Sequence, residues 1–183
     1  MIDRFEIRLS GSGGQGMILA GVILGEAAAV YDGKNATQSQ AYGPEARGGA
    51  SRSEVIISDY DIDYPKATMV DLLLALTQEA CDKYAPQLKD EGILIADADF
   101  VRQIPQGTFK LYHLPIVEVA KKEIGKSVVA NIVALGAVVA ITGIVSREAI
   151  EKAVLSRVPR GTERLNLDAL RAGYKLGDEV SVN

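Results

Sequence analysis

A glycine-rich stretch near the start of the chain constrains the fold more than any other feature. Residues 11–16 read GSGGQG, and glycine is the residue that tolerates the positive φ angles of a tight turn. Before this stretch, polar and apolar residues alternate from Arg4 to Leu9, which predicts a strand with one buried face. After it, Met17 to Val30 is an apolar and small-residue run of helical length. The sequence therefore predicts a strand, a glycine turn and a helix in succession.

A turn that leads directly into a helix suits an anion. The first N–H groups of a helix lack partners within it and the helix dipole is positive there, so a phosphate is the ligand that this turn favours. The pattern of glycines also fits the GxGxxG fingerprint of dinucleotide sites. The candidate contacts are Gly11, Ser12, Gly13, Gly14, Gln15 and Gly16.

Dinucleotide sites have a further requirement, an acidic residue about 20 positions on at the end of the second strand. Asp32 is near that count, but it precedes the next predicted strand, Lys34 to Gln40, which contains no acid. We therefore rank NAD or FAD below a looser phosphate or pyrophosphate contact. A turn whose glycines only allow the helix to pack closely on the strand remains an alternative.

A second irregular segment follows the polar strand. Residues 42–49 read YGPEARGG, a composition that demands a loop. Arg47 stands between small residues and is placed to reach a phosphate or carboxylate, with Glu45 as its candidate partner. A solvated surface turn is the alternative. The candidate site residues of this loop are Tyr42, Gly43, Pro44, Glu45 and Arg47.

Charge and cysteine content exclude several classes of protein. The net charge of -4 provides no overall positive field for nucleic acid. Cys81 is the only cysteine, which excludes an internal disulfide, a multi-cysteine zinc site and an iron–sulfur cluster held by this chain alone. The first residues lack the basic start and apolar core of a signal peptide. We expect a cytoplasmic protein.

Two further features have structural explanations. The apolar segment Val128 to Val145 is of borderline length for a bilayer, but its alanines, valines and glycines favour a helix buried within the domain. His113 is the only histidine and has no serine, cysteine or acid at a triad-like neighbouring position, so we expect a structural strand residue rather than a general base.

Predicted strands alternate with predicted helices, which is the pattern of an α/β fold. We expect one Rossmann-like domain over residues 1–183, a three-layer sandwich with a largely parallel sheet. Ligands of such sheets bind at the carboxyl ends of the strands, where the glycine turn would lie. The predicted strands are residues 4–9, 34–40, 51–63, 70–76, 92–96 and 109–114, and the predicted helices are residues 17–30, 78–88, 116–124, 128–145, 147–158 and 165–176.

The two loops together resemble a known family. Residues 11–16, followed by QAYGPEARGG at 40–49 and by Asn131 at the start of the apolar helix, closely resemble the gamma subunit of 2-oxoacid:ferredoxin oxidoreductases. The similarity covers almost the whole chain, and the continuation ASRSEV at 50–55 is most similar to the 2-oxoglutarate branch.

The resemblance implies a subunit of a larger enzyme. That enzyme decarboxylates a 2-oxoacid, passes electrons to ferredoxin and hands the acyl group to coenzyme A. Thiamine diphosphate, magnesium and iron–sulfur clusters are implied on partner subunits, alpha and beta, with delta as a further candidate. The gamma subunit is implied to help bind coenzyme A, with the backbone of Ser12 to Gly16 meeting the phosphates and Arg47 as an electrostatic partner.

Other readings stay open at this point. The chain is alternatively a purely structural subunit whose loops dock on the catalytic partners, a gamma-like subunit of an indolepyruvate or other 2-oxoacid oxidoreductase, or an independent Rossmann-type nucleotide-binding enzyme. The oxoacid itself is not set by this sequence, since the substrate pocket is implied to lie mainly on the partner chains.

The role of Arg47 gives a first testable prediction. Arg47→Ala should weaken coenzyme A binding to the assembled enzyme by roughly 1.5–3 kcal/mol if the contact is buried, and by less if it is exposed. Arg47→Lys should restore part of the loss, because a point charge does not reproduce a forked donor. A titration of the complex with coenzyme A measures both. Normal affinity combined with failed assembly would instead make Arg47 an interface residue.

Overall fold

The computed structural model describes residues 1–41 and 50–181. The strands are β1 (Phe5–Ser12), β2 (Asn35–Ala41), β3 (Ala50–Ser58), β4 (Val70–Ala75), β5 (Leu88–Asp97) and β6 (Lys110–Leu114). The helices are α1 (Met17–Glu26), α2 (Gln78–Tyr84), α3 (Ile116–Lys122), α4 (Ala130–Thr142), α5 (Arg147–Arg157) and α6 (Glu163–Ser181). A π-helical turn, η1 (Ala27–Tyr31), continues α1, and the 3-10 turns η2 (Ala85–Gln87) and η3 (Ser127–Val129) follow α2 and precede α4.

The strands form one six-stranded sheet in the order β2-β3-β1-β4-β5-β6. β1, β4, β5 and β6 pair in parallel, whereas β3 runs antiparallel to both β1 and β2. The predicted α/β domain with a mostly parallel sheet is therefore confirmed, and the sheet is mixed because β3 runs antiparallel to both of its neighbours.

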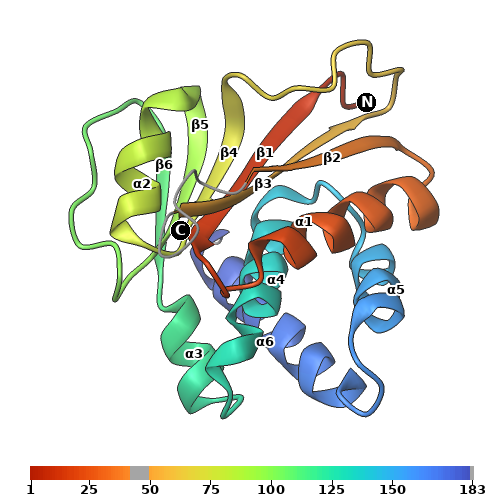
Figure 1. The fold of residues 1–183 in the computed structure, drawn as a ribbon, viewed down its shortest axis with the longest axis vertical. Coiled ribbons are helices and arrows are strands. Elements are labelled where there is room, and N and C mark those ends of the chain that lie inside the picture. The colour runs from red at the N-terminus through yellow and green to blue at the C-terminus, as the bar shows by residue number, and fades with distance from the viewer. Residues whose placement is uncertain (42–49, 182–183) are drawn as a thin grey trace.

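Two apolar clusters lie on opposite faces of the sheet. On one face, Ile7 and Leu9 of β1 belong to a cluster that includes Ile23 of α1 and the apolar residues of α4 to α6. On the other, Leu73 of β4 packs with Cys81 of α2. Figure 1 shows α2 apart from the group formed by α1, α4, α5 and α6. The glycine turn leaves the sheet toward this larger group.

Several predicted boundaries differ from the structure. β3 ends at Ser58, so the acidic segment at residues 59–63 is not part of the strand. β5 begins at Leu88 rather than at residue 92, because the chain turns into the sheet directly after the 3-10 turn at Pro86. Ser127 begins a 3-10 turn and Val129 is the N-cap of α4, without a side-chain cap. Ser146 caps α5, since its hydroxyl accepts from the Ala149 N–H.

α4 is the buried centre of the larger helical layer. Its residues from Ala130 to Val139 are buried, which confirms the predicted internal helix. α4 crosses α6 at two glycines: a Cβ on Gly136 would overlap the Leu170 carbonyl, and one on Gly173 would overlap the Val133 carbonyl. Within residues 1–41 and 50–181, no helix combines the length and the apolar character that crossing a membrane requires.

The glycine crossing predicts a measurable sensitivity. Gly173→Ala should lower the free energy of unfolding by about 1–3 kcal/mol, because the added methyl group forces the two helices apart. Lys175→Ala, on the exposed side of the same helix, is the control and should change it by less than about 0.5 kcal/mol. Denaturant unfolding of both variants decides; equal stabilities would show that the crossing adjusts without cost.

Candidate functional site

The glycine turn joins the end of β1 to the start of α1 in the predicted place. Gly14 and Gly16 adopt positive φ angles of 86° and 73°, a backbone region that strongly favours glycine. Gly16 is the N-cap of α1, and no side chain caps the helix. The first N–H groups of α1 therefore have no capping acceptor from a side chain, as an anion site at a helix start requires.

Gln15 folds back over the turn that it belongs to. Its side-chain oxygen accepts a hydrogen bond from the Ser12 N–H at 2.7 Å, and its own N–H donates to the Ser12 carbonyl at 3.2 Å. A Cβ on Gly11 would overlap this oxygen. Gly11 is therefore explained by the internal structure of the turn rather than by a ligand.

Asn131 of α4 holds the other end of the turn. Its side chain is buried, and its amide nitrogen donates to the Gly16 carbonyl at 3.2 Å. Its amide oxygen accepts from the Ile132 N–H at 2.9 Å. A Cβ on Gly16 would overlap the Asn131 amide nitrogen. Gly16 is thus required both by its φ angle and by the approach of Asn131.

Gly13 and Gly14 form the open rim of the turn. Both are exposed, and a Cβ on either would meet no atom within 4 Å. Gly13 is not among the residues with positive φ, whereas Gly14 is. The positive φ angle thus explains why position 14 is glycine, whereas neither the φ angle nor a neighbouring atom explains glycine at position 13.

Two cavities border this rim. One of about 280 Å³ is lined by Gly14 and Gly16, by the apolar side chains of Leu19 and Leu165, and by the amide of Asn166. The other, of about 320 Å³, is lined by residues that include Gly14, Gln15, Val117, Ser127 and Val128. Gly14 lines both, whereas Gly13 lines neither, so the exposed backbone at Gly14 lies between two hollows large enough for parts of an extended organic ligand.

Asp32 stands at about the spacing from the glycines that the acid of a dinucleotide site requires, but its carboxylate is bound elsewhere in the fold. Its carboxylate accepts from the N–H and the hydroxyl of Ser146, both at 2.6 Å. This contact joins the end of η1 to the start of α5. The arrangement agrees with ranking NAD and FAD below a looser phosphate contact.

The remaining candidates separate into three groups. Gly11 and Ser12 are the last residues of β1, and Gly13 to Gly16 form the turn that follows. Tyr42, Gly43, Pro44, Glu45 and Arg47 lie outside the described residues. His113 forms a 2.7 Å hydrogen bond between its Nε2 and the Val101 carbonyl, as expected of a structural residue.

Burial raises the pKa of the Cys81 thiol to about 11, which leaves it protonated and unreactive near neutral pH.

Sequence reasoning missed a group of charges on the sheet face that α2 covers. Arg8 of β1 forms an ion pair with Glu54 of β3 at 2.8 Å, and Arg52 lies 3.4 Å from the same carboxylate. The alternation of polar and apolar residues in both strands placed these charges on one side of each strand. Arg8 meets Glu54, however, only because β1 and β3 are neighbours in the sheet. The neighbouring relation was not predicted.

Comparisons with known proteins agree on one family. Residues 6–176 match the family described as pyruvate ferredoxin/flavodoxin oxidoreductase. 2-Oxoglutarate synthase subunit KorC of Methanocaldococcus jannaschii is 53% identical over 179 residues, which are 97% of this chain and 96% of that protein.

Solved structures show the same fold. The gamma subunit of a keto/oxoacid ferredoxin oxidoreductase from Geobacter sulfurreducens has a TM-score of 0.87 and 57% identity, covering 94% of this chain and 98% of that one. The 2-oxoglutarate:ferredoxin oxidoreductase of Magnetococcus marinus, solved with 2-oxoglutarate, coenzyme A and succinyl-CoA bound, has a TM-score of 0.86 at 24% identity, over 98% of this chain and 32% of that one.

The different backbones of the two rim glycines predict different stabilities. Gly14→Ala should destabilise the isolated chain by roughly 1–2 kcal/mol, because alanine is strained at positive φ. Gly13→Ala meets neither strain nor a neighbour and should change stability by less than about 0.5 kcal/mol. Thermal unfolding of the two variants tests this. A large loss for Gly13→Ala would contradict the geometry described for the rim.

Proposed function

Since the chain belongs to the pyruvate ferredoxin/flavodoxin oxidoreductase family and is a gamma subunit of 2-oxoglutarate:ferredoxin oxidoreductase, we propose that its glycine turn helps to bind coenzyme A. The observation that carries the proposal is the bare rim at Gly13 and Gly14, beside a helix start without a side-chain cap. A phosphate of the coenzyme would accept hydrogen bonds from the first N–H groups of α1, where the helix dipole also favours negative charge.

The hollows on either side of the rim support the same proposal. Coenzyme A is long, with anionic phosphates at one end and a weakly polar arm at the other, so its binding surface must combine both characters. The cavity beside Leu19 and Leu165 supplies apolar walls, and the buried amide of Asn166 supplies a polar group within them. In the Magnetococcus marinus complex, whose fold this chain shares, coenzyme A was bound.

The loop residues remain part of the proposal on sequence grounds. Arg47 is proposed as a cation for a phosphate, with Glu45 as its orienting partner, and Tyr42, Gly43 and Pro44 as further lining residues. The exposed aromatic rings of Tyr31, Tyr60 and Tyr64 support a docking role for the chain as well, because tyrosine is enriched at protein interfaces. Docking and coenzyme binding are compatible roles for one subunit.

The residues that the structure describes do not fit a redox centre. Among residues 1–41 and 50–181 there is no group of three or more His, Cys, Asp or Glu side chains that could hold a metal ion, and Cys81 is buried. We therefore propose that thiamine diphosphate, magnesium and the iron–sulfur clusters are held by the alpha and beta subunits, and a delta subunit where one is present. This chain would bind and orient the acyl acceptor and help to close the site against water.

Gly13→Ala is the sharpest test, because the chain's own structure tolerates the methyl group. In the assembled enzyme, this variant should raise KM for coenzyme A about tenfold or more, since the methyl group occupies the space that the phosphate must enter. The reduction of clusters by 2-oxoglutarate without coenzyme A should stay near normal. Equal losses in both assays would indicate a structural or assembly role, and unchanged kinetics would contradict coenzyme binding at the turn.

A further inference from the structure

The sheet face that α2 covers, opposite α1, carries a cluster of charged residues where β1 pairs with β3. The pairing of β1 with β3 sets Arg8 opposite Glu54 and Ser10 opposite Arg52. Side chains at such paired positions lie on the same face of a sheet. Tyr84 at the end of α2 lies against this row, with Arg8 5.1 Å and Arg52 5.5 Å from the centre of its ring.

Arg8 is fully engaged in this cluster. Its side chain is 2% exposed, and its guanidinium lies 2.8 Å from the Glu54 carboxylate. A second nitrogen donates to the same carboxylate oxygen at 3.0 Å, and a third donates to the side-chain oxygen of Gln87. Arg8 therefore uses the negative charge of Glu54 to neutralise its own buried charge.

Arg52 is left without an equivalent partner. Its Nε lies 3.4 Å from the Glu54 oxygen that Arg8 already occupies. That Nε is buried and makes no hydrogen bond, and no hydrogen bond joins its other nitrogens to the residues that the structure describes. Two guanidinium groups thus share one carboxylate. The Tyr84 ring lies against the Arg52 guanidinium, whose two terminal nitrogens stay available as donors.

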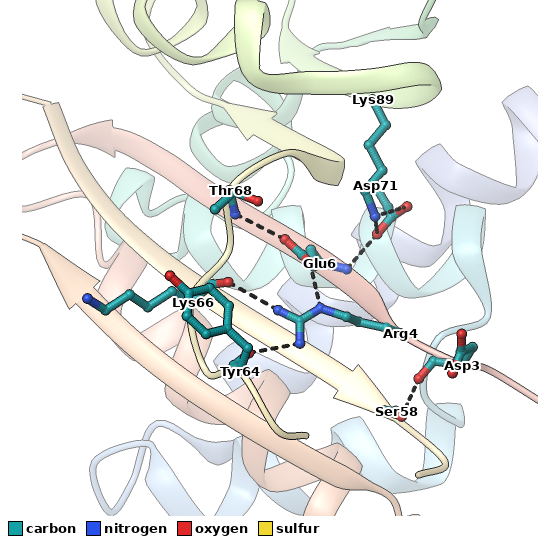
Figure 2. Close-up of polar contacts among 9 residues, drawn as sticks. All are labelled: Asp3, Arg4, Glu6, Ser58, Tyr64, Lys66, Thr68, Asp71 and Lys89. Carbon is teal, nitrogen blue, oxygen red and sulfur yellow. Dashed lines mark hydrogen bonds and ion pairs between the residues drawn. The ribbon is translucent and has the colours of Figure 1, made fainter. Parts of the chain in front are cut away.

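A second cation comes from a segment that is anchored to β1. Arg4 donates to the carbonyls of Tyr64 and Lys66 at 2.8 and 3.1 Å, and Glu6 accepts from the Thr68 N–H at 3.2 Å. Figure 2 shows this network, with the Lys66 ammonium extending away from it. The backbone of Lys66 is therefore positioned while its charge remains free of any ion pair within residues 1–41 and 50–181.

Arg52 and Lys66 line one cavity of about 310 Å³, together with Ser39, Gln40, Glu54 and Ala67. Ser39 pairs with Glu54, so it lies on this face of the sheet and its hydroxyl adds a neutral donor to the two cations. Glu54 is the one carboxylate in this lining, and its charge is already shared by Arg8. The lining therefore has an excess of positive charge and of hydrogen-bond donors.

We infer that this cavity is a second anion site, which binds a phosphate group. Arg52 offers a forked pair of donors to two phosphate oxygens, and Lys66 adds a point charge. The site is separate from the glycine turn, because Arg52 lies on the sheet face of α2 whereas α1 lies on the opposite face. The phosphate comes either from free phosphate or from a phosphate-bearing cofactor such as coenzyme A.

Titration of the full chain with sodium orthophosphate tests the inference, at constant ionic strength in a buffer without phosphate. Arg52→Gln should weaken orthophosphate binding at least about tenfold, and Lys66→Gln, whose side chain is exposed, about threefold or more. The control is Arg164→Gln, which removes an exposed arginine on α6 and should leave the affinity unchanged. Gly13→Ala should leave the Arg52-dependent binding unchanged too.

The same titration identifies the source of the phosphate. Displacement of the Arg52-dependent orthophosphate by coenzyme A would support the inference with the cofactor as occupant, and persistence would support it with free phosphate. Orthophosphate binding that is equal in the wild type and both Arg52→Gln and Lys66→Gln would overturn it. No binding to the wild type would also overturn it, and is the result expected if these cations instead face an acidic surface of a partner subunit.

Discussion

The hydrogen bond from Asn131 to the Gly16 carbonyl is the contact on which the site depends. It ties the start of α1 to α4, which is buried from Ala130 to Val139, so the core holds one end of the turn. Gly16 permits this approach because it lacks a Cβ and tolerates a positive φ. With Gln15 closing the turn from inside, the only backbone left bare is the rim at Gly13 and Gly14. A rim anchored at both ends in this way is suited to a ligand that must be placed accurately.

The two faces of the sheet differ in their balance of apolar packing and charge. On the face of α1, the buried layer is almost wholly apolar, and the glycine crossing of α4 and α6 draws the helices close together. On the face of α2, the short helix packs beside β3, and the ion pairs of Arg8 and Arg52 with Glu54 lie on that part of the sheet. Coenzyme binding is proposed on the first face and the further anion site on the second.

Much of this could be predicted from the sequence, and the exceptions have physical causes. The strand, turn and helix around Gly11 to Gly16 followed from period-2 alternation and glycine chemistry, which are local. The antiparallel placement of β3 beside β1 was not predicted, because strand order is a long-range property, and the Arg8–Glu54 pair depends on it. The partners of Asp32 and Asn131 lie more than 100 positions away in the chain, beyond the reach of any local pattern.

Hydrogen–deuterium exchange on the assembled enzyme tests the central claim most directly. If the rim and the start of α1 bind coenzyme A, adding the coenzyme should slow exchange at the amides of residues 13–19, because phosphate oxygens then accept hydrogen bonds from them. The amides of α6 far from the rim serve as an internal reference and should not change. Equal exchange of residues 13–19 with and without saturating coenzyme A would contradict the account.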